Sequence, residues 1–261
     1  MLPDAETTFD ISTGLEVGGP EPQSITLEHC VSSSRDLVGL QLWRGAFLLA
    51  DFLLSQPSLV TGRKVLELAA GTGLTAVTAG MMADTVTATG GCDKCCSRLD
   101  RFTFADVDRG EILALLERNG KRNKSSMATC KWGVKEMDFF WDNWTDDIET
   151  VVGDSQVVLA ADVVYDRDIT KHFFKTLRKI LSYAPKVAFI AIEKRQRTGC
   201  GGAVVAPNFE YFLENLSQLH LSKPKENVII NVKEEDTKFP QYFSYTRVQE
   251  LTLWKIESSL T

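Results

Sequence analysis

Residues 64–82 read KVLELAAGTGLTAVTAGMM, and this stretch decides the predicted fold. It opens with a short apolar segment at 65–68, which is typical of a buried strand. A turn that contains Gly71 and Gly73 follows, and an apolar segment at 74–82 predicts a helix. A strand, a glycine-rich turn and a helix in this order indicate the first unit of an open α/β sheet.

Short apolar segments alternate with helical patterns over the rest of the chain. Further strands are predicted at 86–89, 134–137, 157–161 and 187–192, and further helices at 111–119, 168–182 and 208–219. This alternation predicts a parallel sheet with helices on both faces. The last two strands, at 227–233 and 249–256, have no helix between them, so we expect an antiparallel pair. The predicted fold class is therefore α/β, a Rossmann-like seven-strand sheet of five parallel strands plus an antiparallel terminal pair.

The sequence predicts one folded domain at residues 25–261. Residues 1–24 are polar and contain several glycines and prolines, so we expect a flexible lead-in. A strand is expected at 24–31. The helix expected at 42–54 is apolar almost all round and should pack at the edge of the sheet. Residues 90–105 separate the second strand from its helix, where a connection normally takes about two to six residues, and we interpret them as an insertion.

Composition and charge argue against several classes of protein. The 261 residues are 44% hydrophobic and 25% charged, as in ordinary globular proteins, and no apolar run is long enough to cross a bilayer. The N-terminus lacks the basic and apolar regions of a secretory signal, so we expect an intracellular protein of the nucleus or cytoplasm. The net charge of −6 comes with no dominant basic footprint, so direct nucleic-acid binding is not expected.

Three of the six cysteines, Cys92, Cys95 and Cys96, lie close together in the sequence. Thiolates at this spacing are good zinc ligands, but a structural zinc site normally needs four ligands. No second pair of cysteines or nearby pair of histidines completes such a set. We therefore expect reduced thiols and no metal site.

The predicted turn after residue 68 is the first candidate binding site. Ligands of open α/β sheets lie outside the carboxyl ends of the strands, where the strand order reverses. Gly71 and Gly73 allow the backbone to approach a ligand closely. Glu67 places a carboxylate in a strand that should be buried on both faces, which is costly unless a cation or hydrogen bonds compensate it. Residues 71–76 also fit the G-x-G-x-x-A pattern of dinucleotide-binding proteins, so a nicotinamide cofactor remains an alternative.

Carboxylates near two further strand ends point to the same cleft. A carboxylate after the second strand should accept hydrogen bonds from ribose hydroxyls, but Gly90 occupies its usual place. Asp106 is our candidate if the insertion loops out. Asp108 is the alternative, although it could equally be the N-cap of the following helix. Asp162 and Tyr165 follow the fourth strand and place a carboxylate and a phenol at the mouth of the cleft.

Four segments, in this order, resemble the family 16 methyltransferases: WRGA (43–46), ELAAGTG (67–73), DVVY (162–165) and EKR (193–195). These seven-strand enzymes use S-adenosyl-L-methionine to methylate lysine, and occasionally histidine, on specific proteins. The resemblance covers residues 36 to 256, and the D-x-x-Y motif is its most specific element. The closing segments FPQ (239–241) and QELTLWKI (249–256) look most like one member of the family.

The resemblance implies a role for each matching residue. It assigns cofactor binding to Trp43, Glu67, Ala69, Ala70, Gly71, Gly73, Asp106, Asp138, Phe139 and Ala161. Among these, Asp106 would hold the ribose, and Asp138 and Phe139 would flank the adenine. Asp162 and Tyr165 would hold the target side chain as catalytic residues. Two positions depart from the family pattern, because Ala69 replaces the first glycine of the motif and Phe139 replaces the usual tryptophan.

The implied reaction needs a neutral amine. A free lysine, with a pKa near 10.4, is protonated at neutral pH, and a partly apolar channel lowers that pKa. We expect Asp162 and the Tyr165 hydroxyl to orient the nitrogen, with Asp162 or a water molecule as proton acceptor. The expected partner is a protein that presents a lysine to a monomeric enzyme. The alternatives are a histidine or small-amine methyltransferase, a nicotinamide-dependent oxidoreductase and a non-catalytic binding protein.

Overall fold

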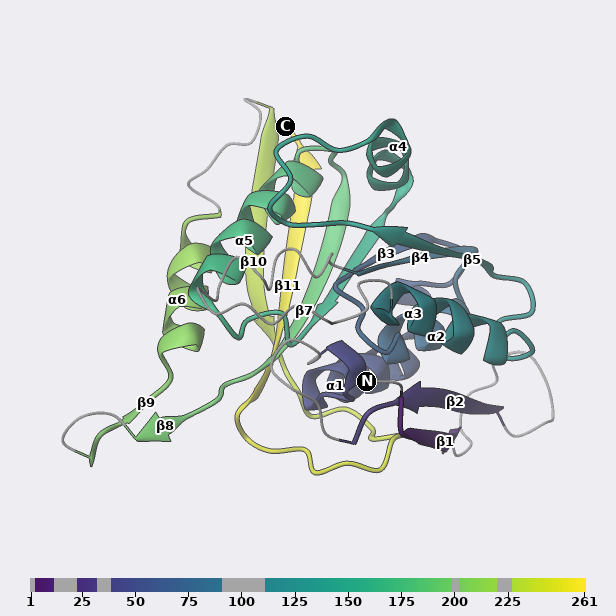
Figure 1. The fold of residues 1–261 in the computed structure, drawn as a ribbon. Helices are drawn as coiled ribbons and strands as arrows, with labels where there is room; N and C mark the ends of the chain where they lie inside the picture. Colours follow the sequence, from purple (N-terminus) through teal and green to yellow (C-terminus); the bar gives the residue numbers. More distant parts are fainter. Residues whose placement is uncertain (1–2, 12–22, 32–38, 91–110, 199–201, 220–226) are drawn as a thin grey trace.

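The computed structural model describes residues 3–11, 23–31, 39–90, 111–198, 202–219 and 227–261. A seven-stranded sheet forms its centre, with helices on both faces and two separate two-stranded hairpins (Figure 1). The strands of the central sheet, in spatial order, are β10 (Val228–Glu235), β11 (Leu251–Leu260), β7 (Lys186–Glu193), β6 (Val157–Ala161), β3 (Lys64–Leu68), β4 (Thr85–Gly90) and β5 (Lys131–Glu136). The predicted α/β fold class is confirmed.

The strand order reverses beside β3, as the sequence predicted. β3 pairs in parallel with β4 on one side and with β6 on the other, so the chain leaves β5 and returns past β3 to continue with β6 and β7. β11 pairs antiparallel with both β7 and β10, which confirms the antiparallel terminal pair. Ligands of open α/β sheets bind at such a reversal point.

The two faces of the sheet carry separate hydrophobic layers. On one face lie α1 (Arg44–Ser55), α2 (Leu74–Gly80) and α3 (Glu111–Arg122), and on the other lie α4 (Asp146–Asp154), α5 (Arg167–Leu181) and α6 (Pro207–Ser217). Side chains along β3 point to alternate faces of the sheet. Val65 belongs to the first hydrophobic layer, and Leu66 and Leu68 belong to the second. Strands buried on both faces in this way have near-continuous apolar sequences.

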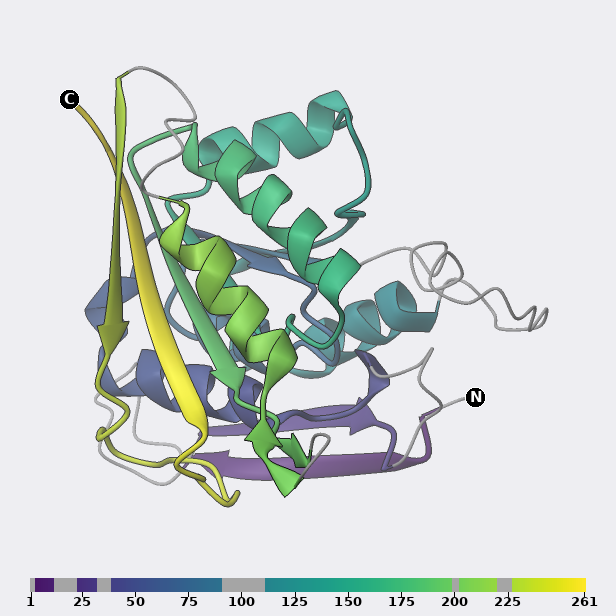
Figure 2. The same ribbon diagram turned by 90° about the vertical axis from the view of Figure 1, so that its left-hand side faces the viewer.

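The position of α1 corrects the prediction that this helix packs at the sheet edge. α1 contacts β6, β7 and β11, which lie inside the sheet, and it also contacts α2. Its outer side is covered as well, because Phe47 packs against Phe9 of the N-terminal segment and Phe243 of the loop between β10 and β11. Figure 2 shows this loop and the N-terminal hairpin alongside α1. A helix that is apolar almost all round needs cover on most sides, which a sheet edge cannot give.

Residues 5–11, which the sequence analysis assigned to a flexible lead-in, form strand β1 (Ala5–Ile11). β1 pairs antiparallel with β2 (Gln23–His29), from Ala5 opposite His29 to Ile11 opposite Gln23. Its side chains alternate between exposed and covered positions, and Phe9 lies on the covered side. The prediction of a lead-in is therefore wrong for these residues, while 12–22 lie outside the described residues.

Other elements also went unpredicted. They are α4, a 3-10 helix at Pro57–Leu59, and the short hairpin of β8 (Arg197–Thr198) and β9 (Val204–Val205). The insertion predicted at 90–105 lies, beyond Gly90, outside the described residues, as do Cys92, Cys95 and Cys96. Among the helices that the structure describes, none is both long enough and apolar enough to span a bilayer.

Candidate functional site

The turn that follows β3 requires glycine at two positions. Gly71 and Gly73 have φ angles of 57° and 83°, in the left-handed region that favours glycine. A Cβ atom on Gly71 would lie 3.0 Å from the Gly39 carbonyl oxygen, and one on Gly73 would lie 2.9 Å from a methyl carbon of Leu116. The Ala70 N–H donates to the Thr89 carbonyl of β4 at 2.7 Å, and the Gly73 N–H donates to the Ala70 carbonyl at 2.8 Å. These contacts fix the turn at the carboxyl end of β3.

Ala69 begins this turn in a left-handed conformation, with a φ angle of 51°. An L-residue with a Cβ atom is disfavoured there by roughly 1–2 kcal/mol. The family motif has glycine at this position, so the departure noted in the sequence carries a conformational cost in the structure. The turn keeps its path because its neighbours hold it through hydrogen bonds.

Because Ala69 is strained, we expect Ala69→Gly to raise the free energy of unfolding by about 1 kcal/mol. This value allows for the greater conformational entropy of glycine in the unfolded chain, which opposes the gain. Urea denaturation measures the gain. Ala70→Gly is the matched control, because Ala70 is not among the described residues with a positive φ angle, and we expect this variant to be less stable than the parent. Equal losses in both variants would show that Ala69 is unstrained.

Glu67 is buried in β3 with a carboxyl group that is only partly satisfied. Its side chain is 1% exposed, and within the described part of the chain its Oε2 atom has no hydrogen-bond partner. Burial raises the pKa of Glu67 to about 8, against hydrogen bonds from the Thr75 side chain and the Ala76 backbone that lower it. A group of this kind is either protonated or paired with a cation. In the protein without a ligand the raised pKa favours the protonated form of Glu67, whereas a cation next to it would favour the ionised form.

Asp162 follows β6 and connects three segments through its carboxylate and backbone. Its Oδ2 accepts a hydrogen bond from the Gly45 N–H at 2.7 Å, and its Oδ1 accepts one from the Glu193 N–H at 2.9 Å. Its own N–H donates to the Ala191 carbonyl at 2.9 Å. Burial raises the pKa of Asp162, although these N–H groups and the charge of Arg195 oppose the shift. Asp162 thus joins the start of α1 to the end of β7.

Gly45 makes this contact possible. A Cβ atom there would lie 2.7 Å from Asp162 Oδ2 and 3.1 Å from the Ala191 carbonyl oxygen, too close for either. Gly45 belongs to the segment WRGA, but the sequence alone predicted no role for it. A glycine in the first turn of an otherwise apolar helix is a signal that another group packs closely against the backbone there. This signal could have predicted a contact at Gly45.

The outer segments of the resemblance meet at the same end of the sheet. Trp43 precedes α1, and the Arg195 guanidinium lies over its ring, 4.3 Å from the ring centre. Next to this pair, Arg44 forms an ion pair of 2.7 Å with Glu193. WRGA and EKR are almost 150 residues apart in sequence, yet they touch each other and Asp162.

Tyr165 is partly exposed to solvent, at 37% of its surface. Its carbonyl accepts a hydrogen bond from the Asn208 side chain at 2.6 Å, which ties the D-x-x-Y segment to the first turn of α6. Ala161, the last residue of β6, is half-buried and pairs with Ala191 of β7. Both residues lie where the sequence analysis expected them, after or at the end of the fourth predicted strand.

The two residues predicted to flank the adenine, Asp138 and Phe139, are buried after β5. Asp138 is 7% exposed, and its Oδ1 accepts a hydrogen bond from the Phe140 N–H at 2.8 Å. Phe139 is 9% exposed and packs edge-on against Phe173 of α5, with ring centres 5.6 Å apart. Their adenine contacts stay a prediction. Asp106 and Asp108, the candidates for the ribose, lie outside the described residues.

Comparisons with known proteins agree on one family. A family model described as lysine methyltransferase matches residues 23–201. Methyltransferase-like protein 22 of Mus musculus is 32% identical over 248 residues, which cover 89% of this chain and 58% of that protein. The Homo sapiens protein of the same name is 32% identical over 261 residues, covering 93% of this chain and 60% of that protein.

A more distant relative carries a more explicit name. Protein-lysine N-methyltransferase EEF2KMT of Mus musculus is 28% identical over 170 residues, covering 62% of this chain and 45% of that protein. The chain spans less than two thirds of the length of these relatives. The family resemblance drawn from the motifs is confirmed, and the chain is similar to methyltransferase-like protein 22 over most of its length.

Proposed function

The chain belongs to the lysine methyltransferase family, and from this premise we propose that it transfers a methyl group from S-adenosyl-L-methionine to a lysine side chain of another protein. One observation carries the proposal. β3 and β6 pair in parallel, with Leu68 opposite Ala160, so the glycine-rich turn and Asp162 emerge side by side from neighbouring strands. A cofactor site and an acceptor site at adjacent strand ends are what a methyl transfer between two bound molecules needs.

The residues present fit the cofactor. S-Adenosyl-L-methionine carries an ammonium and a sulfonium, and the Glu67 oxygen that has no hydrogen-bond partner among the described residues can compensate positive charge. Gly71 and Gly73 have no side chain, so a ligand can approach the backbone of the turn closely at these two positions. We propose that Trp43, Glu67 and residues 69–73 hold the methionine end and that Asp138 and Phe139 lie near the base. When bound, the cofactor supplies an electrophilic methyl group.

Asp162 and Tyr165 are proposed to receive the amine. A carboxylate oxygen offers more than one acceptor site, so Asp162 can hold Gly45 and Glu193 and still orient a nitrogen. Burial around Asp162 lowers the pKa of an entering lysine, whereas an ionised Asp162 carboxylate would raise it. The amine must lose its proton before it attacks, and Asp162 or a water molecule is the proposed acceptor. Tyr165 marks the entrance.

Two measurements test the proposal. Calorimetry is expected to show binding of S-adenosyl-L-methionine and no binding of NAD, because the chain offers a cation site beside the turn. Incubation with labelled S-adenosyl-L-methionine in a cell extract is expected to place label on a lysine, identified by gel and mass spectrometry. Label on a histidine or a small amine would change the acceptor class. Binding without any labelled product would favour a non-catalytic protein.

A further inference from the structure

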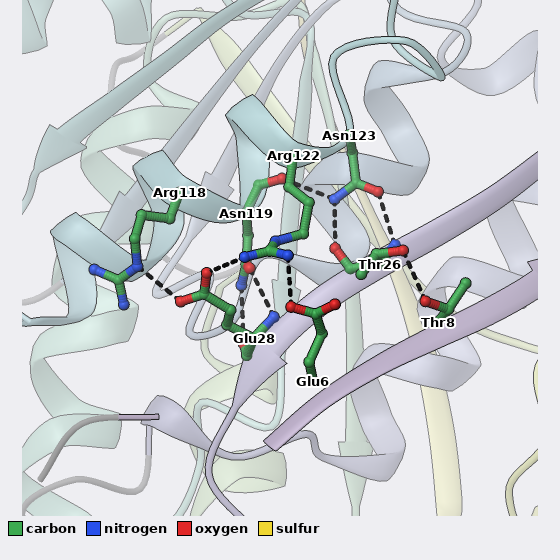
Figure 3. A network of polar contacts seen from close by, with 8 residues as sticks. All are labelled: Glu6, Thr8, Thr26, Glu28, Arg118, Asn119, Arg122 and Asn123. Carbon is green, nitrogen blue, oxygen red and sulfur yellow. Dashed lines mark hydrogen bonds and ion pairs between the residues drawn. The ribbon is translucent and has the colours of Figure 1, made fainter. Parts of the chain in front are cut away.

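The β1–β2 hairpin is attached to α3 by two asparagines (Figure 3). Asn119 accepts a hydrogen bond from the Glu28 N–H at 2.8 Å and donates to the Glu28 carbonyl at 3.0 Å. Asn123 does the same for Thr26, accepting at 2.8 Å and donating at 2.7 Å. Each carboxamide therefore pairs with the backbone of β2 as a neighbouring strand would. Arg118 and Arg122 add ion pairs to Glu28 on the exposed side of this contact.

The spacing of the two asparagines matches the strand. Four residues of helix rise about 6.0 Å, and two residues of strand span about 6.8 Å. Asn119 and Asn123 therefore meet Glu28 and Thr26 in register, and α3 covers the edge of β2 that β1 does not pair with. Covering an edge with a helix is one way in which proteins protect unpaired strand groups.

Asn119 makes one contact that Asn123 lacks. Its second amide hydrogen is donated to the Thr72 carbonyl at 2.9 Å, whereas that of Asn123 is donated to the Asn119 carbonyl of the same helix at 2.7 Å. Thr72 stands between Gly71 and Gly73 and is 3% exposed, and Asn119 is fully buried. The same carboxamide thus holds the hairpin and the middle of the glycine-rich turn.

The chain that leaves β2 returns to this turn. The Cys30 N–H donates to the Leu40 carbonyl at 2.7 Å, and the Gly39 carbonyl lies beside Gly71. Trp43 follows three residues after Leu40. Residues 39–43 therefore pass from the β1–β2 hairpin to the glycine-rich turn. The contact of the hairpin with α3 fixes the position of the first residues of this segment.

We propose that Asn119 is a positioning residue that holds the glycine-rich turn in its ligand-binding conformation and couples it to the hairpin. This inference rests on the proposed function in that the ligand of the turn is S-adenosyl-L-methionine. A turn that is ordered before binding needs no ordering by the ligand, which improves affinity. Loss of the amide donor frees Thr72 between two glycines, the most flexible residues of the chain.

Asn123 supplies a matched control for the test. Asn119→Ala, in α3, and Asn123→Ala, one residue past its end, each remove three hydrogen bonds between a carboxamide and backbone groups, and only the first variant affects a contact with the turn. We expect Asn119→Ala to weaken binding of S-adenosyl-L-methionine roughly tenfold in calorimetry, the equivalent of about one buried hydrogen bond. Asn123→Ala should bind close to wild type. Equal dissociation constants for the two variants would overturn the inference.

Hydrogen exchange of residues 68–76 without ligand separates this inference from the proposed function. Faster exchange in Asn119→Ala than in Asn123→Ala supports the positioning role, even if the wild-type protein binds no S-adenosyl-L-methionine and the proposed function fails. The same rate in both variants contradicts it. If either alanine variant does not fold, the pair Asn119→Gln and Asn123→Gln, which keeps the amide but lengthens the side chain, is compared with the same expectations.

Discussion

Asp162→Ala is expected to abolish methyl transfer and to lower the free energy of unfolding by roughly 2–6 kcal/mol. The loss arises because the backbone N–H groups of Gly45 and Glu193 lose their acceptors in a buried place, at about 1–3 kcal/mol each. Alanine must also adopt the φ angle of 51° that Asp162 has. Urea denaturation measures the stability, and labelled-methyl transfer measures the activity, at a temperature where the variant is folded.

Asp166→Ala is the control for this experiment. The Asp166 side chain also accepts two backbone N–H groups, those of Asp168 and Ile169, but it does so as the N-cap of α5. Its removal should cost about 1 kcal/mol and leave methyl transfer in place. A folded Asp162→Ala variant that still transfers methyl groups would refute the proposed role of Asp162. We expect that variant to retain cofactor binding, since the turn after β3 does not depend on the carboxylate.

Local sequence patterns predicted the centre of the sheet because strands such as β3 and β6 are buried on both faces. The apolar segments at 65–68 and 157–161 have no other stable placement than the middle of a covered sheet, and both became strands. β1 escaped prediction for the opposite reason. Its sequence, AETTFDI, is mostly polar, its apolar residues Ala5, Phe9 and Ile11 alternate with exposed ones, and the strand packs against partners such as Phe47 that are distant in sequence.

The sequence predicted where in the fold the site lies, but it did not predict which residues contact each other there. Strand ends located Glu67 and Asp162, because parallel strands bring their carboxyl ends to one edge. The partners of the Asp162 carboxylate lie 117 residues before it and 31 residues after it, and no local pattern encodes such pairings. The role of Asn119 could not be predicted either, because it lies within an ordinary amphipathic helix. Its contacts with Glu28 and Thr72 depend on the tertiary fold.

Glu67 should give the stability of the protein an unusual dependence on pH. The pKa of this carboxyl is about 8 in the folded protein, against an ordinary value of 4.5. Between these values the folded state holds a proton that the unfolded state has lost, so the free energy of unfolding falls as pH rises from about 4.5 to about 8. Glu67→Gln keeps the shape of the side chain without the titration. We expect this variant to lose less stability than wild type across that range, by several kcal/mol at most.

Glu28→Gln is the opposite control, because hydrogen bonding to Arg118 lowers the pKa of Glu28 and stabilises its ionised form. Glu28 contributes stability above its unfolded pKa and loses it as pH falls, so Glu28→Gln should be less stable than wild type at neutral pH. Urea denaturation at pH values from 5 to about 8.5 compares the three proteins. Parallel curves for wild type and Glu67→Gln would show that Glu67 is ionised in the folded protein.

The same proton connects Glu67 to ligand binding. A cationic ligand beside the Glu67 carboxyl favours its ionised form, so binding of S-adenosyl-L-methionine below pH 8 should release a proton. The affinity for the ligand should therefore rise with pH until Glu67 is already ionised in the ligand-free protein. Calorimetry in two buffers of different ionisation enthalpy measures that release. Glu67→Gln should bind more weakly at pH 8 and release no proton. This release requires both the buried carboxyl of Glu67 and the positive charge of the ligand. If the affinity for S-adenosyl-L-methionine instead fell as pH rises, the positive charge of the ligand would not bind beside Glu67.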